Sequence, residues 1–349
     1  MKPELERAPG AALSLRDFAE QGALYEGLIR TLRDGSYVHA YLISGPAGIG
    51  KRSLAHLMAQ GLLCTAKDVE KPCGACPSCQ QVRDGNHPDV LEVRVGGPLC
   101  PSEDAKKKDI TVGQMRNVVR EVGQHSFVGG CKVVIVEEAE KMNRSAANAF
   151  LKTLEEPPEG TVFLLLTDKP EMLLDTIVSR CRPLKMHPWR DEYVLQVLTT
   201  RGMDDGLARR AVAVCGGSIG RAMDVAGDED YWKQRHDVMQ DFFGLASRSD
   251  ILTVSGAWKD RKDDADALLD DVEDLLRMLM LVRLGRQDEA MLQEFPQQWQ
   301  SMAASAPLES FINLMDAVTE ARRLRSNNVT WQPVLERLLL RMMEEKSKW

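Results

Sequence analysis

The sequence of 349 residues has no apolar run that approaches the roughly 20 residues needed by a membrane-spanning helix. Its opening residues, MKPELERAPG, lack the apolar core of a secretory signal. These two absences argue against a membrane protein and a secreted one, so we expect a cytosolic location. In a reducing cytosol, the eight cysteines should not form disulfides.

Positive charge is also scarce, because 45 Lys and Arg residues face 52 Asp and Glu residues, for a net charge of −7. Nucleic-acid affinity comes mostly from Lys and Arg, so a stand-alone nucleic-acid binder is not expected, and any DNA contact should be local or shared with partners. The chain contains no internal repeat. What remains is the composition of a globular protein, 44% hydrophobic and 28% charged, long enough for two or three domains.

The first half of the sequence alternates strand-like and helix-like segments. We expect strands at 40–44, 89–95, 132–136 and 162–167, of which KVVIV and VFLLLT have the apolar runs of strands buried on both faces. One helix should begin after Asn143, a good N-cap, and end before Pro157. This alternation predicts an α/β domain, a parallel sheet with helices on both faces.

After about residue 188 the strand signals stop. Short helices are expected up to residue 228, and longer amphipathic helices follow. We therefore divide the chain into an α/β domain (1–187), a small helical domain (188–228) and a helical bundle (229–349). Apolar residues share three helical faces in the bundle, the first with Leu268, Val272, Leu275, Leu279 and Val282, the second with Phe311, Leu314, Val318 and Ala321, the third with Leu335, Leu338 and Met342.

A phosphate loop, GPAGIGKRS (45–53), follows the first expected strand. Its glycines let backbone N–H groups turn toward an anion, and its lysine reaches the outer phosphates. The following helix adds the positive end of its dipole. The order strand, loop, helix is the context that makes this motif specific. The candidate phosphate-binding residues are Gly45, Gly48, Gly50, Lys51, Arg52 and Ser53.

The groups that hold Mg²⁺ in such sites are altered. The residue after the lysine should be Ser or Thr, whose hydroxyl binds the ion, but Arg52 has no acceptor atom. Ser53 cannot replace it, because one residue turns a helix by about 100°. After the strand at 132–136, Glu137 and Glu138 stand where an ATPase has Asp-Glu. Glu138 could orient a water or be a solvated carboxylate. We expect weak or absent hydrolysis, with ATP or ADP bound without a well-formed Mg²⁺ site.

Four cysteines, Cys64, Cys73, Cys76 and Cys79, have the spacing C-x8-C-x2-C-x2-C. The short C-x2-C steps let two thiolates face one ion, and four thiolates suit tetrahedral Zn²⁺. The alternative is four unligated thiols, which would invite oxidation if exposed. Because four sulfurs close the site to water, the zinc should be structural. His87 is either a further candidate ligand or a surface histidine.

Two arginines have both a functional and a structural interpretation. Arg180, in TIVSRC, is either a surface arginine in a salt bridge or an arginine finger, a cation presented to a neighbour's γ-phosphate. Such a finger is worth about 10³–10⁵ in rate and makes sense only in a ring assembly. Arg221, in GGSIGRAMD, could approach a nucleotide in the same chain or cap a helix.

Together these segments resemble the bacterial clamp-loader AAA+ family over about residues 20–225. The resemblance rests on the four cysteines, HAYLISGPAGIGK (39–51), KVVIVEEAEKMNRSAANAFLKTLEEPP (132–158), LLLTD (164–168) and SRC (179–181). The last 120 residues match the family in length and helical character alone. The resemblance implies an AAA+ P-loop domain with a zinc module inserted at about 64–79, a small helical lid and an all-α collar that oligomerises.

Within this family, the gamma/tau motor subunit has segments like GKTS at the phosphate loop and IDEVH at the second metal-binding strand. This chain has GKRS and VEEAEKM at those places. The chain therefore looks like the non-hydrolysing stator. The family then implies a five-subunit ring with gamma/tau and delta subunits, which opens the beta sliding clamp and places it on primer-template DNA. Arg180 would complete the ATP site of the adjacent motor, Thr167 falls at the sensor-1 position, and Arg221 falls near sensor 2.

Three functions compete for this sequence: a non-hydrolysing scaffold that donates Arg180, a gamma/tau-type ATPase motor, and a zinc-dependent DNA-binding module. Arg52 and Glu137 argue against the motor. The acidic balance argues against the DNA-binding module, as does the lack of interleaved aromatic and basic residues around Cys73–Cys79. We therefore favour the scaffold.

Overall fold

The computed structural model describes residues 14–67, 70–124, 126–127, 130–261, 265–286, 295–326 and 329–349. The opening decapeptide examined for a secretory signal lies outside these residues. The chain forms two compact units, one of Met1–Met203 with Gly216–Arg221 and the other of Asp204–Cys215 with Ala222–Trp349. Among the described helices, none is both long and apolar enough to cross a membrane.

A five-stranded parallel sheet organises the first unit, with strand order β2-β3-β4-β1-β5. Its strands are β1 Ala40–Ser44, β2 Val90–Val93, β3 Lys132–Val136, β4 Thr161–Thr167 and β5 Arg182–Lys185. The predicted parallel sheet is confirmed, and β3 and β4 are buried along their whole length. The sequence-based prediction misses β5, because its residues RPLK include one buried side chain and a proline that an edge strand tolerates.

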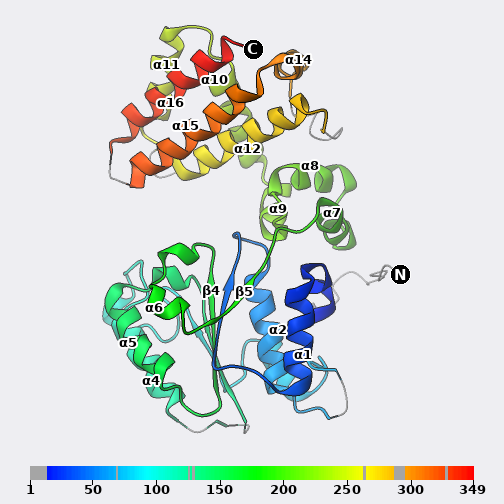
Figure 1. The fold of residues 1–349 in the computed structure, drawn as a ribbon, viewed down its shortest axis with the longest axis vertical. Helices are drawn as coiled ribbons and strands as arrows, with labels where there is room; N and C mark the ends of the chain where they lie inside the picture. Colours follow the sequence, from blue (N-terminus) through cyan, green and yellow to red (C-terminus); the bar gives the residue numbers. More distant parts are fainter. Residues whose placement is uncertain are drawn as a thin grey trace. The chain divides into compact units, whose positions relative to one another are not determined.

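Helices cover both faces of the sheet, as predicted. In Figure 1, α1 and α2 lie on one side and α4, α5 and α6 on the other. Asn143 caps α5, since its side chain accepts a hydrogen bond from the N–H of Ala146 at 2.9 Å. The helices are α1 Ala23–Asp34, α2 Lys51–Leu63, α3 Pro77–Arg83, α4 Val112–Val122, α5 Arg144–Glu155, α6 Asp175–Val178 and α7 Asp191–Thr200. The 3-10 helices are η1 Leu15–Gln21, η2 Ser102–Asp104, η3 Ala139–Lys141 and η4 Pro170–Met172.

The sheet register brings three loops to one edge. In the parallel pairing Ser44 lies beside Thr167, and Val136 lies beside Leu165. The carboxyl ends of β1, β3 and β4 are therefore neighbours, and the segments that follow them meet there. Open α/β sheets bind ligands at this edge, so the phosphate loop and Glu137 share one site.

The described secondary structure of the second unit is helical. Its elements are α8 Asp205–Cys215, α10 Glu229–Phe243, α11 Arg248–Trp258, α12 Ala265–Arg283, α14 Gln297–Ser305, α15 Leu308–Ser326 and α16 Trp331–Lys346, and α9 Ile219–Ala226 is divided between the units after Arg221. All twelve residues of the three predicted apolar faces are buried in one continuous core. The predicted helical bundle is confirmed.

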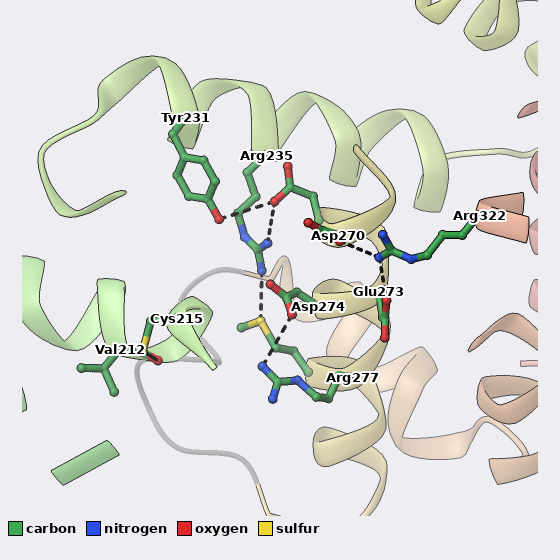
Figure 2. A network of polar contacts seen from close by, with 11 residues as sticks. Val212, Cys215, Tyr231, Arg235, Asp270, Glu273, Asp274, Arg277 and Arg322 are labelled. Carbon is green, nitrogen blue, oxygen red and sulfur yellow. Dashed lines mark hydrogen bonds and ion pairs between the residues drawn. The ribbon is translucent and has the colours of Figure 1, made fainter. Parts of the chain in front are cut away.

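A buried charge pair crosses the core of the second unit. Arg235 of α10 is 1% exposed, and its Nη1 lies 3.5 Å from Oδ1 of Asp271 on α12. Nη2 of Arg235 lies 3.2 Å from the sulfur of Met278. Nearby, Arg322 reaches from α15 to Asp270 and Glu273 of α12 (Figure 2). Two arginines thus tie α12 to two of the helices packed against it, α10 and α15.

Candidate functional site: a phosphate loop, a cysteine cluster and an exposed arginine

The segments after β1, β3 and β4 enclose a cleft of about 330 Å³. It contains three glycine or alanine positions of the phosphate loop, two cations and four carboxylates. Ser53, a candidate from the sequence, does not line it. The lining residues are Ala47, Gly48, Gly50, Lys51, Arg52, Glu137, Glu138, Glu140, Leu166, Thr167 and Asp168.

The loop has the glycine conformations that its motif predicts. Gly45, Gly48 and Gly50 have φ values of 152°, 72° and 98°, which side-chain-bearing residues rarely adopt. A Cβ atom on Gly45 would lie 2.7 Å from the carbonyl oxygen of Met186, and one on Gly48 would lie 2.4 Å from Oγ of Ser218. At Gly45 and Gly48 both space and backbone angle therefore require glycine, whereas at Gly50 the backbone angle alone does.

Two side chains, one from the loop itself and one from Trp189, which follows β5 in the sequence, donate hydrogen bonds to carbonyl oxygens of the loop. Nζ of Lys51 donates to the carbonyl oxygens of Gly45 and Pro46, each at 2.8 Å. Nε1 of Trp189 donates to the carbonyl oxygen of Ile49, also at 2.8 Å. Burial lowers the pKa of Lys51, and the nearby carboxylates of Asp168 and Glu140 oppose this shift.

The segment at the start of α9 closes on the same loop. The N–H of Gly220 donates to the carbonyl oxygen of Gly48 at 2.8 Å, so backbone meets backbone. The backbone N–H of Arg221 donates to Oγ of Ser218 at 3.1 Å, which caps the helix. Arg221 therefore directly follows Gly220, the residue that contacts the phosphate loop.

Arg52 is engaged by carboxylates from two strands. Its Nη2 lies 3.0 Å from Oε2 of Glu92 on β2, and its Nε lies 3.2 Å from Oε1 of Glu137 after β3, without the alignment of a hydrogen bond. Nε2 of His56 lies 3.2 Å from Oε1 of Glu92. Burial lowers the pKa of His56 despite the Glu92 charge, so the ring is a neutral partner at pH 7.

Glu138 and Glu140, two further carboxylates of the cleft, also interact with other groups of the chain, although Oε2 of Glu140 is buried without a hydrogen-bond partner among the described residues. Glu138 has φ of 48°, a strained backbone for a non-glycine residue, and its Oε1 lies 2.6 Å from Nζ of Lys141. Burial raises the pKa of Glu140, the charge of Asp168 adds to this, and a hydrogen bond from the hydroxyl of Thr167 opposes it. Oγ1 of Thr167 also accepts from the N–H of Lys169 at 3.0 Å.

The four cysteines of the predicted zinc module lie together. The sulfur atoms of Cys64, Cys73, Cys76 and Cys79 are all within 4.8 Å of one another. Sγ of Cys73 lies 3.9 Å from Sγ of Cys79, close to the edge of about 3.8 Å expected for a tetrahedron with metal–sulfur bonds of about 2.3 Å. Burial raises the pKa of Cys76, but backbone N–H donors outweigh it and bring the pKa to about 6. The donor set fits one tetrahedral, thiolate-preferring ion.

Both sequence-based interpretations of His87 are wrong, because it is buried and lies outside the cysteine group. Its Nδ1 accepts from the N–H of Asp89 at 3.1 Å, so Nε2 carries the proton and donates to Oγ of Ser78 at 2.8 Å. Ser78 belongs to α3, the helix that carries Cys79. His87 thus fastens the cysteine module to the start of β2.

Arg180 lies between α6 and β5, away from the cleft. The next residue, Cys181, is 7% exposed and packs in the core beneath α5, which turns Arg180 toward the surface. Nη2 of Arg180 lies 2.6 Å from Oε1 of Glu155, and Nη1 donates to the carbonyl oxygen of Thr176 at 2.8 Å. Its side chain is 33% exposed.

Sequence analysis missed the residues that support the site from a distance. Glu92 lies on a strand that is neither adjacent to the phosphate loop in sequence nor marked by a motif. Trp189 and Gly220 stand more than 130 positions from the loop carbonyls that they contact. Only GGSIG, a glycine-rich helix start, offered a signal, since repeated glycine indicates close backbone approach.

Residues 20–190 match the protein family described as DNA polymerase III, delta subunit. The delta' subunit of DNA polymerase III from Bacillus subtilis (strain 168) is 27% identical over 339 residues, 95% of this chain and 99% of that protein. The delta' subunit from Pseudomonas aeruginosa is 48% identical over 145 residues, 42% of each chain. The tau/gamma subunit from Haemophilus influenzae is 38% identical over 165 residues, 47% of this chain and 22% of that protein.

Proposed function

The chain belongs to the delta-prime subunits of the bacterial DNA polymerase III clamp loader, and we propose that it acts there as a non-hydrolysing stator that donates Arg180 to an adjacent ATPase subunit. One observation carries the proposal. Arg52 and Glu137 pair with each other at 3.2 Å, at the two positions where an ATPase holds Mg²⁺. The cleft keeps the loop geometry of its fold while its metal-binding positions are committed to each other.

The residues at these two positions do not fit Mg²⁺. A divalent ion beside Glu137 would lie close to the Arg52 guanidinium, and like charges at short range repel strongly in a partly buried site. Glu92 holds the guanidinium there at 3.0 Å. We therefore propose no hydrolysis by this chain. Glu138 has no catalytic role in this proposal, because it pairs with Lys141. ATP or ADP would meet the loop amides, Lys51 and Arg52 without the ion, with Thr167 and Arg221 nearby.

The remaining parts of the chain fit the same role. We propose a structural Zn²⁺ on the four clustered cysteines, and three domains at 1–187, 188–228 and 229–349, the last serving as the collar. Partners would be gamma/tau and delta subunits in a five-membered ring that loads the beta sliding clamp onto primer-template DNA. A cytosolic location remains a prediction. The zinc assignment rests on the four clustered cysteines, and the assignment of partners rests on family membership and on the partly exposed guanidinium of Arg180.

The test is Arg180→Ala in the reconstituted clamp-loader complex. Removing a cation from the nucleotide of the adjacent subunit should lower the clamp- and DNA-stimulated ATPase of that site by about 10³-fold, the lower end of the range for arginine fingers. Ring assembly, followed by gel filtration, should not change, because Arg180 lies on the surface with two local contacts. An ATPase equal to that of the parent complex would remove the proposal.

The alternative, an ATP-hydrolysing motor of the gamma/tau type, is tested on the isolated chain. The Arg52–Glu137 pair leads us to expect no Mg²⁺-dependent ATP turnover above background. Turnover that disappears on Lys51→Ala would demonstrate a motor and contradict the stator assignment.

A further inference from the structure

The carboxylate of Glu155 is the strongest contact that Arg180 makes. Nη2 of Arg180 lies 2.6 Å from Oε1 of Glu155, a short, charge-assisted hydrogen bond. The second contact, from Nη1 to the carbonyl oxygen of Thr176, belongs to the helix just before the arginine. Arg180 is therefore held from two directions, one within its own segment and one from α5.

Two contacts hold the guanidinium in place without using all of its N–H donors. An arginine carries five N–H donors in a rigid plane, and these contacts use two of them. Among the described residues, no partner exists for the other three. A planar group held at one edge can present its remaining donors to phosphate oxygens in a defined direction. A free arginine would lose that orientation to side-chain rotation.

Glu155 occupies a position that does not favour a carboxylate. It is the last residue of α5, where the helix dipole is negative and a cation is preferred. The following residues include Pro157 and Pro158, which do not continue a helix. The contact with Arg180 compensates the local electrostatic cost. An arrangement that is unfavourable locally and compensated by one partner is typical of functional sites.

We propose that Glu155 is a positioning residue, which orients the Arg180 guanidinium toward the nucleotide of the adjacent subunit. This inference rests on the proposed function of Arg180. Glu155 itself does not reach the nucleotide; it sets the direction and the order of the cation that does. Loss of Glu155 leaves Arg180 with its charge and with the Thr176 contact alone.

The experiment uses the reconstituted complex with Glu155→Ala, Glu155→Gln and Arg180→Ala. We expect Glu155→Ala to lower kcat of the stimulated ATPase by about 10- to 100-fold, as for a misplaced catalytic group, with KM for ATP unchanged. Glu155→Gln keeps an acceptor oxygen at the same reach, so it should remain within about threefold of the parent. Glu156→Ala is the matched control, since this neighbouring glutamate is exposed and its side chain has no partner among the residues that the structure describes.

The double variant separates positioning from a structural effect. If Glu155 acts through Arg180, then Glu155→Ala should cause no further loss in the Arg180→Ala background. An additional loss there, reduced ring assembly, or a higher ATPase in Glu155→Ala would overturn the inference. If Arg180→Ala itself has no effect, the proposed function fails. If Arg180→Ala lowers the rate and Glu155→Ala does not, the positioning role alone fails.

Discussion

Gly220 tests whether the phosphate loop depends on the backbone that closes on it. In Gly220→Ala the new Cβ would lie 2.9 Å from the carbonyl oxygen of Gly48 and 3.0 Å from its Cα. Both are backbone atoms, which cannot rotate away. The segments must separate by a few tenths of an ångström, and the hydrogen bond between the Gly220 N–H and the Gly48 carbonyl weakens with them.

The magnitude follows from three opposing contributions. Overpacking costs about 1–3 kcal/mol, and a weakened hydrogen bond costs up to about 1 kcal/mol. Alanine in a helix gains about 0.5–1 kcal/mol over glycine. We therefore expect Gly220→Ala to lower the free energy of unfolding of the first unit by about 2 kcal/mol, the middle of a range of about 0–3.5 kcal/mol. The amides of residues 45–53 should exchange hydrogen faster, by the factor that corresponds to this loss of unfolding free energy.

The matched control is Gly27→Ala, a helical glycine of the same unit whose added Cβ meets nothing within 4 Å. This substitution should raise the free energy of unfolding by about 0.5–1 kcal/mol, and the loop amides should exchange as in the parent. Urea titration with peptide-resolved hydrogen exchange measures both variants. If Gly220→Ala proves as stable as Gly27→Ala, with unchanged exchange in the loop, the reasoning about backbone approach is refuted.

Two further predictions concern the helical unit and the cysteines. Arg235→Met should lower the free energy of unfolding of the second unit by about 3–5 kcal/mol, because Asp271 stays buried without its cation. The control Arg337→Ala, which removes an exposed ion pair, should lower this free energy by at most about 1 kcal/mol. If urea titration finds equal losses for Arg235→Met and Arg337→Ala, the argument from burial is contradicted. Elemental analysis should find one zinc per chain, absent in Cys79→Ser and retained in Cys100→Ser. Chelation should speed hydrogen exchange in α3; a chain without zinc would remove the assignment.

Local signals predicted most of the fold because each is a short-range physical preference. Apolar runs located β3 and β4, Asn143 located the start of α5, and helical spacing located the core of the bundle. The short strand β5 was not predicted, since it is defined by its pairing with β1 and has one buried side chain of its own. Arg235 escaped as well, because a charged residue in an amphipathic helix normally indicates the solvent face.

For the site, motifs identified groups and the structure identified their partners. The phosphate-loop motif identified the glycines of the loop, and Arg52 could be recognised as unsuitable for Mg²⁺ from its chemistry alone. No local rule could pair Arg52 with Glu92, or Arg180 with Glu155, because those contacts depend on which strands and helices become neighbours. Long-range pairs of this kind follow from topology.

The two basic regions of the first unit differ in how their donors are used. In the cleft, Lys51 is engaged by loop carbonyls and Arg52 by Glu92 and Glu137. At the surface, Arg180 keeps three donors beyond its contacts with described residues. Replacing Arg52 by threonine would thus not by itself create a motor, because position 137 would still hold a glutamate, whose carboxylate lies one methylene further from the backbone than the aspartate of an ATPase. A working metal site therefore requires both positions to change together, whereas the role proposed for Arg180 requires only the donors that it already presents.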